Sequence, residues 1–80
     1  MTRDQLNASI AAILTTLDET DGGPESMIYL ALGTNMKDWE TVKSVLTHNK
    51  LTTSTNHYMQ LTEKGKTLAR ELNAIMQKTA

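Results

Sequence analysis

The sequence changes from strand-like to helical at residues 58–66, Tyr58-Met59-Gln60-Leu61-Thr62-Glu63-Lys64-Gly65-Lys66. Side chains alternate along a strand, so Met59 and Leu61 fall on one face, which we expect to point to the core. Thr62 favours the N-cap of a helix that covers residues 62–77. The apolar stripe of this helix consists of Leu68, Ala69, Leu72, Ile75 and Met76.

A β-hairpin is predicted over residues 51–61. The run Leu51-Thr52-Thr53 consists of strand formers, like residues 58–61. The polar segment Ser54-Thr55-Asn56-His57 between the two runs has the length of a hairpin connection. Gly65 is expected to allow close packing of the helix that follows the hairpin, because it has no side chain.

An amphipathic helix is predicted over residues 1–18. Thr2 can cap this helix while Gln5 reaches back to it, as in a capping box. The apolar residues recur at spacings of three and four, which is the helical period. They are Leu6, Ile10, Ile13, Leu14 and Leu17.

Residues 24–49 predict two helices joined by a short turn. Pro24 suits the first position of a helix that ends before Gly33. The apolar stripe of this helix is Met27, Ile28, Ala31 and Leu32. The next helix runs from near Lys37 to about Asn49, with the stripe Trp39, Val42, Val45 and Leu46. Trp39 and Tyr29 lie in the apolar pattern, so we expect both in the core.

These segments predict a mainly α fold with a small β-hairpin, in the order α-α-α-β-β-α. Two helices joined by a tight turn that contains glycine form a helix-turn-helix unit. The length of 80 residues leaves room for one core, so residues 1–80 are expected to form a single domain.

Two stretches of the sequence carry a family resemblance: residues 45–51, Val45-Leu46-Thr47-His48-Asn49-Lys50-Leu51, and the pattern Leu61-Thr62-x-x-Gly65 after the hairpin. Both resemble winged-helix transcriptional regulators of the MarR and PadR groups. The resemblance covers roughly residues 24 to 76. It implies a winged helix-turn-helix fold in which the third helix enters the major groove of duplex DNA. The sequence departs from the family pattern at the hairpin tip, which is not basic, and at Asp38 and Glu40, which begin the third helix.

The charge distribution leaves two partner classes open. The formal net charge is -1, yet residues 1–33 carry one basic and five acidic side chains, whereas residues 34–66 carry five basic and three acidic ones. The basic excess favours an anionic partner for the second half, and DNA is the first interpretation. The near-neutral total and the polar hairpin tip favour the alternative, a winged-helix module that binds another protein.

The third helix and the hairpin supply the candidate DNA-binding residues. Opposite the apolar stripe, this helix presents short hydroxyl and charged side chains that can reach base edges or phosphates, and the polar hairpin tip can reach the neighbouring backbone. An ordinary solvated helix face and a turn chosen for its geometry are the alternative interpretations. The candidates are Lys37, Thr41, Lys43, Ser44, Thr47, His48, Lys50, Thr55, Asn56 and His57.

A homodimer through the first and last helices is a further expectation. The apolar residues of these helices exceed what one small core needs, and in the resembled regulators such helices often pair across a two-fold axis. These residues are Leu6, Ile10, Ile13, Leu17, Leu72, Ile75 and Met76. The alternative is that they pack against each other within one chain.

Other functional classes find no support in the sequence. There is no cysteine, His48 and His57 lack further ligands at a metal-binding spacing, and no catalytic set can be recognised, so we expect neither an enzyme nor a cofactor or metal. The acidic residues Asp18, Glu19, Asp21 and Glu25 are expected to form a solvated loop. No apolar run approaches the roughly 20 residues that span a bilayer, and a cytoplasmic protein without a membrane partner is expected.

Overall fold

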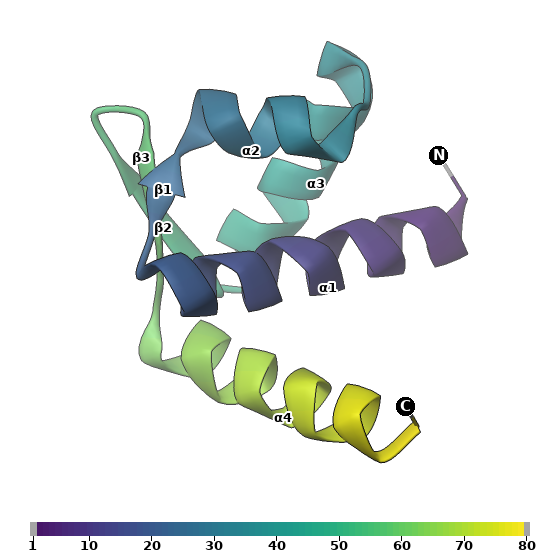
Figure 1. Cartoon of the computed structure of the whole chain (residues 1–80). Coiled ribbons are helices and arrows are strands. Elements are labelled where there is room, and N and C mark those ends of the chain that lie inside the picture. The colour runs from purple at the N-terminus through teal and green to yellow at the C-terminus, as the bar shows by residue number, and fades with distance from the viewer. Residues whose placement is uncertain (1, 80) are drawn as a thin grey trace.

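The computed structural model describes residues 2–79, with the side chains of residues 2–75. This part of the chain forms four helices and a small three-stranded antiparallel sheet (Figure 1). The helices are α1 (Arg3–Thr20), α2 (Glu25–Leu32), α3 (Met36–His48) and α4 (Glu63–Thr79). The strands are β1 (Gly23–Pro24), β2 (Thr52–Thr55) and β3 (Tyr58–Leu61). The expectation of a mainly helical fold with a small hairpin is confirmed.

Strand β1 corrects the predicted order of elements. Pro24 does not begin a helix but pairs with Tyr58, next to Gly23, which pairs with Met59, and the sheet order is β1-β3-β2. Proline fits an edge strand because it has no N–H to donate. Helix α2 therefore begins one residue later, at Glu25. A strand of two residues is too short to produce a detectable period, so the sequence pattern could not indicate it.

The hairpin forms as predicted, with a tighter turn. Residues 52–55 pair with residues 58–61, which leaves only Asn56 and His57 between the strands. Both have positive φ, 51° and 62°, as in a type I′ turn, whose twist matches that of the flanking strands. The four-residue connection expected over residues 54–57 is therefore wrong by two residues. Met59 is fully buried and Leu61 partly buried, which confirms the face predicted for β3.

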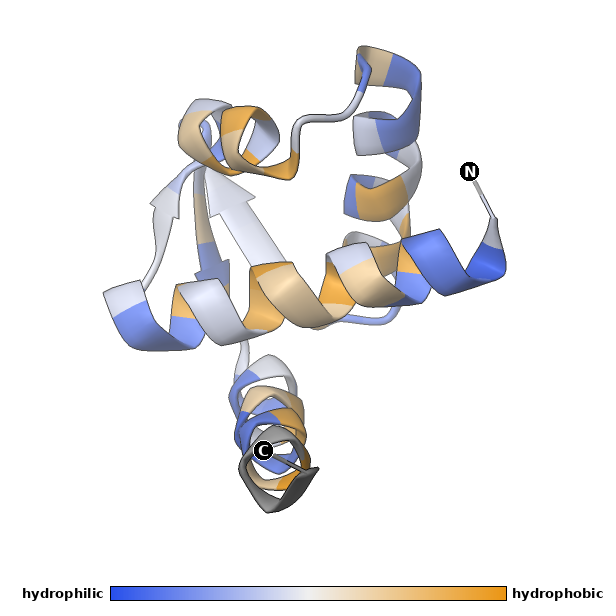
Figure 2. Ribbon diagram, turned by 45° about the vertical axis from the view of Figure 1, so that its right-hand side comes forward, coloured by the Kyte–Doolittle hydropathy of each residue, from blue (hydrophilic) through white to orange (hydrophobic). Residues whose placement is uncertain are grey.

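Helix α1 lies between α4 on one side and α2 and α3 on the other (Figures 1 and 2). The capping box of Thr2 and Gln5 is present at its N-terminus, as predicted. Trp39 is buried, and its ring centroid lies 6.2 Å from that of the half-buried Tyr29. The buried apolar residues are Ile13, Leu14, Leu17, Ile28, Trp39, Val42, Leu46, Leu51, Met59 and Ala69.

The predicted apolar stripe of α2 divides into two parts. Ile28 is buried and Leu32 packs against the core together with Tyr29, whereas Met27 and Ala31 are exposed. The face of α2 that packs against the core thus consists of Ile28, Tyr29 and Leu32, and it is rotated about the helix axis relative to the predicted stripe. Apolar periodicity alone could not distinguish the two faces, because α2 carries apolar residues on most of its circumference.

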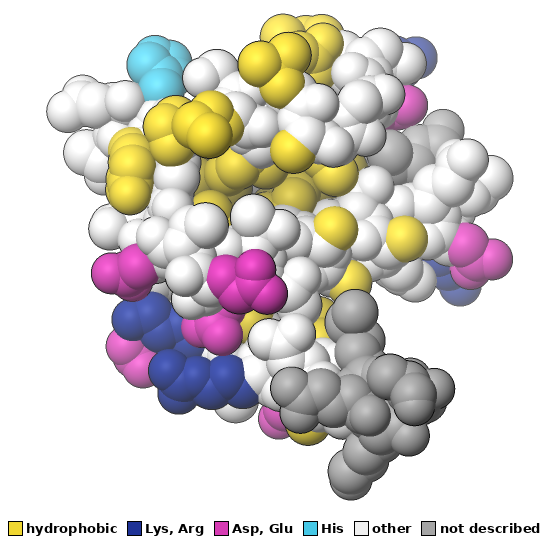
Figure 3. All heavy atoms as spheres, viewed as in Figure 1, with side chains coloured by type: hydrophobic (Ala, Val, Ile, Leu, Met, Phe, Trp, Pro, Cys, Tyr) yellow, Lys and Arg dark blue, Asp and Glu magenta, His cyan; other side chains and the backbone are white. Residues whose placement is uncertain are grey.

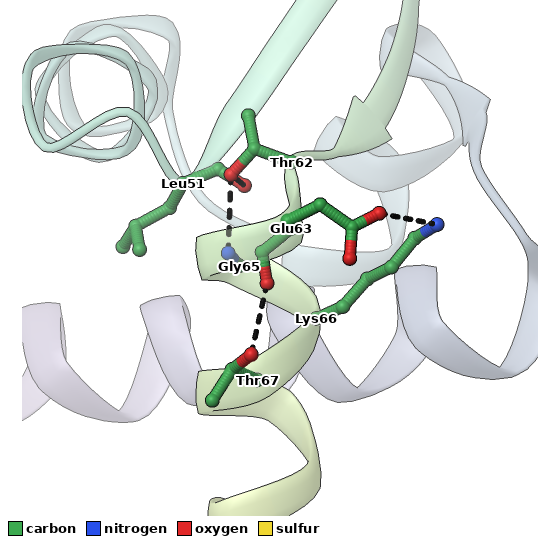
Figure 4. A network of polar contacts seen from close by, with 6 residues as sticks. All are labelled: Leu51, Thr62, Glu63, Gly65, Lys66 and Thr67. Carbon is green, nitrogen blue, oxygen red and sulfur yellow. Dashed lines mark hydrogen bonds and ion pairs between the residues drawn. The ribbon is translucent and has the colours of Figure 1, made fainter.

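The start of α4 is fixed against the end of α3 (Figure 4). The Thr62 hydroxyl accepts a hydrogen bond from the Gly65 N–H at 3.1 Å and donates to the Lys50 carbonyl oxygen at 2.6 Å. The Thr62 N–H donates to the Leu51 carbonyl oxygen at 3.0 Å. A Cβ atom at position 65 would overlap this Leu51 oxygen, so α4 can lie this close only with glycine there. The predicted roles of Thr62 and Gly65 are confirmed.

Gly65→Ala should destabilise the protein by about 2 kcal/mol, because the new methyl group overlaps the Leu51 carbonyl. Elsewhere in a helix the same substitution stabilises by roughly 0.5–1 kcal/mol, so the sign is diagnostic. Urea unfolding measures the difference. Thr67→Ala, at an exposed position two residues further along α4, is the control and should change stability by less than about 0.5 kcal/mol. Equal or higher stability of Gly65→Ala would contradict the packing described.

Candidate nucleic-acid interface

The exposed face of α3 carries five of the ten candidate residues. Lys37, Thr41, Ser44, Thr47 and His48 are exposed and follow one another at helical spacing, so they share one side of the helix. Opposite them, Trp39, Val42 and Leu46 are buried. The structure thus brings these candidates together on a surface that the core does not need.

Two threonine hydroxyl groups on this face donate their protons to backbone carbonyl oxygens of α3. The Thr41 hydroxyl donates to the Lys37 carbonyl oxygen at 3.1 Å, and the Thr47 hydroxyl donates to the Lys43 carbonyl oxygen at 2.9 Å. A hydroxyl in this position keeps its oxygen lone pairs available as acceptors. Both side chains are therefore set to accept from donors, such as the exocyclic amines of adenine and cytosine in the major groove.

A shallow hollow lies over the second half of α3. It is lined by Glu40, Lys43, Ser44, Thr47 and His48. Four of these five are candidate residues. Glu40 is exposed, so an acidic side chain lies among the candidates, as the sequence indicated.

The hairpin tip is tied to the start of α2. The exposed residues Thr55, Asn56 and His57 form this tip. The Glu25 N–H donates to the His57 carbonyl oxygen at 2.8 Å, beside the pairing of Pro24 with Tyr58. This bond satisfies one of the free N–H groups at the start of a helix that lacks a side-chain cap. The tip is consequently held at a fixed position relative to α2.

Glu25 also holds α3. Its Oε1 atom lies 2.8 Å from the Nζ atom of Lys43, and its side chain is only 10% exposed, against 41% for Lys43. Asp18 and Glu19 lie in the last turn of α1 and not in the predicted loop, because the helix extends to Thr20. The expectation that Glu25 belongs to a solvated acidic loop is also wrong, because its backbone and side chain bind two other elements. No local sequence signal reveals this role, since Lys43 lies far along the chain and the sequence pattern gave no indication of β1.

Lys50 occupies the junction between α3 and β2. Its backbone is left-handed, with φ 58°, and its N–H donates to the Thr47 carbonyl oxygen at 3.0 Å. The side chain is exposed. Among the candidate cations in the described part of the chain, Lys43 is neutralised by Glu25, whereas Lys37 and Lys50 have no ion pair. The positive charge of this surface therefore rests on the two ends of α3.

The terminal helices use most of their apolar residues within the chain. Ile13 and Leu17 are buried, and Leu6, Ile10 and Leu72 pack against the core. Ile75 is 59% exposed, and the Met76 side chain lies outside the described residues. The alternative interpretation, packing within one molecule, accounts for Leu6, Ile10, Ile13, Leu17 and Leu72.

Within the described residues, no three His, Asp or Glu side chains gather closely enough to hold a metal ion. None of the helices described is both long and apolar enough to cross a bilayer. No protein-family model, curated protein or solved structure was found to match the chain.

Glu25→Gln should lower the free energy of unfolding by about 1 kcal/mol, because Lys43 loses its partner at a largely buried contact. Glu40→Gln removes the same charge from an exposed position of α3 and should have an effect below about 0.5 kcal/mol. A double-mutant cycle with Lys43→Met isolates the coupling of the pair. Zero coupling would contradict the ion pair.

Proposed function

We propose that this chain is a winged helix-turn-helix protein of the cytoplasm that binds duplex DNA and regulates transcription. In this proposal α2 and α3 are the helix-turn-helix unit, α3 enters the major groove, and the hairpin of β2 and β3 is the wing. The element order α1-β1-α2-α3-β2-β3-α4, with residues 33–35 as the turn between α2 and α3, supports this reading.

The observation that carries the proposal is the exposed polar face of α3 beside an anchored hairpin tip. The core uses only the opposite side of α3, so the exposed side is free for a partner. Glu25 binds both the tip and α3, which fixes the distance between the two surfaces before any partner arrives. A preorganised pair of contact surfaces loses little entropy on binding.

The residues divide into positioning and reading roles. Lys37 and Lys50, at the two ends of α3, would contact phosphates, and the tip residues Thr55, Asn56 and His57 would contact the neighbouring backbone. Thr41, Ser44, Thr47 and His48 would face base edges. Because the hydroxyls of Thr41 and Thr47 are set to accept, adenine N6 and cytosine N4 are their proposed partners.

Fluorescence anisotropy with mixed-sequence duplex DNA tests the proposal. Binding at low salt should weaken sharply at about 0.2 M salt, and Lys37→Ala or Lys50→Ala should each weaken it for all sequences and reduce the salt slope by about one. Arg70→Ala, on the exposed surface of α4, is the control and should leave the affinity unchanged. Thr41→Ala should cost about 1 kcal/mol and relax preference at one base pair.

A variant of the Glu25–Lys43 ion pair provides a second test of DNA binding. Glu25→Gln keeps the backbone bond to the hairpin tip but removes a negative charge and releases Lys43 to contact phosphate. The gain in positive charge should exceed the loss of the contact between Glu25 and α3, so DNA affinity should rise about threefold, or about 0.7 kcal/mol. Glu71→Gln removes a charge from the exposed surface of α4 and should change affinity less. Absence of binding at low salt, or an unchanged affinity and salt slope for both lysine variants, would contradict the DNA proposal.

A second candidate function is favoured by the charges of the same surface. Glu25 neutralises Lys43 and the acidic Glu40 lies on the exposed face of α3, which interrupts the positive surface that phosphates prefer. A winged-helix module that binds a protein through α3 would account for both. The homodimer through α1 and α4 stays a prediction, which sedimentation of the purified protein would test.

A further inference from the structure

An apolar groove separates α1 from α2 on a face that the proposed DNA interface does not use. The groove has a volume of about 300 Å³ and is open to solvent. Its floor consists of the buried side chains of Ile13, Leu17 and Ile28, and its rims include the exposed residues Thr16, Met27 and Ala31. Figure 3 shows this hollow as a yellow floor between the two helices. We call it the α1–α2 groove.

Apolar surface continues from the groove onto α2. Met27 is 64% exposed and Leu30, one turn further along the helix, is 74% exposed. Met27 belongs to the predicted stripe of α2, whereas Leu30 lies outside it. Exposed apolar side chains next to an apolar hollow typically mark a binding surface. A small molecule in the hollow would leave Leu30 uncovered, whereas a helix lying along the groove would cover both.

Beyond the first turn of α1, the two helices that form the groove carry charges of one sign. Between Arg3 and Lys37 the chain has no lysine, arginine or histidine, so the charged residues of α1 beyond its first turn and of α2 are all acidic. Thr20 and Gly22 line one end of the groove, next to Asp18, Glu19 and Asp21. In the described part of the chain these three carboxylates form no ion pair, although Lys66 of α4 lines the same small polar pocket as Asp18 and Asp21. Figure 3 shows acidic side chains below this end of the hollow, with basic side chains directly beneath them.

The acidic residues beside the groove favour a basic partner over a second copy of this chain. A second copy of the chain, placed across a two-fold axis, would bring two acidic surfaces together, which is unfavourable. A partner with apolar residues along one side and lysine or arginine beside them complements both the floor and the rim. An amphipathic helix meets this requirement, because residues at i, i+3, i+4 and i+7 lie on one face.

We propose that the α1–α2 groove binds a cationic amphipathic helix of another protein. The apolar face of that helix would cover Ile28, Met27 and Ala31, and its basic residues would lie near Glu19 and Asp21. Because the groove is formed by α1 and α2, the proposed DNA surface of α3 and the hairpin stays open while the helix is bound. A chain of this kind would link a DNA site to a second protein, yet the groove proposal does not depend on DNA binding.

A synthetic helical peptide tests the groove without knowledge of the natural partner. The probe is a fluorescein-labelled peptide of about 18 residues with leucine along one face and lysine on both flanks, and a second peptide carries glutamate in place of lysine. Titration of full-length protein, without DNA, should show binding of the lysine peptide and at least about tenfold weaker binding of the glutamate peptide. Amide shifts in ¹⁵N-labelled protein should concentrate in residues 12–32.

Matched variants separate the groove from general attraction to an acidic protein. Ala31→Arg places a charge on the groove rim and should weaken binding of the lysine peptide at least about tenfold, whereas Ser26→Arg adds the same charge to an exposed α2 position outside the groove and should change it less than about twofold. The pair Glu19→Gln and Asp21→Asn should weaken binding more than Glu40→Gln with Glu71→Gln, which removes equal charge elsewhere. Circular dichroism confirms that each variant is folded.

Three results would overturn the proposal. One is no binding of the lysine peptide to folded protein. Another is equal weakening by Ala31→Arg and Ser26→Arg, which would assign the binding to overall charge. The third is a homodimer that Ala31→Arg dissociates, which would make a second copy the occupant. None of these results bears on the DNA titration, because none of its variants changes a residue that lines the groove.

Discussion

Glu25 is the residue on which the arrangement of the proposed interface depends. Its N–H holds the hairpin tip at His57, and its carboxylate holds Lys43 on α3. Strand β1 places this residue, because the pairing of Gly23 and Pro24 with β3 brings the start of α2 to the tip. This arrangement also reduces the positive charge of the surface, because the Glu25 carboxylate neutralises Lys43. A protein that binds phosphates must then rely on Lys37 and Lys50 at the two ends of α3.

A second constraint fixes the other side of the hairpin. The Leu51 carbonyl oxygen accepts the Thr62 N–H while Gly65 packs against the same peptide group, so the end of α3, the hairpin and the start of α4 meet at one point. Helix α4 in turn supports α1 (Figure 1). The hairpin is therefore bonded to α2 at its tip and to the start of α4 at its base. The two-residue turn at Asn56 and His57 is tight, so the two strands have little freedom to move relative to each other.

The sequence allowed prediction of those features that a local pattern encodes. Thr2 with Gln5, Thr62 with Gly65 and the alternation of Met59 and Leu61 each act within a few residues, and the structure has them as expected. Glu25, β1 and the groove depend on contacts between distant segments, and no period or spacing marks them. The surplus of apolar residues on α2 was the one visible signal of the groove, yet a stripe pattern assigns such residues to the core.

A titration of ¹⁵N-labelled protein with a short DNA duplex, followed by amide chemical shifts, would show whether α3 and the hairpin bind DNA together. We expect the largest shifts in residues 37–50 and 55–57, and also at the Glu25 amide, because it is bonded to the tip. Residues of α1 that line the groove should stay unchanged. Shifts confined to α1 and α2, or none at all at low salt, would contradict the proposal that α3 and the hairpin form a single DNA-binding surface.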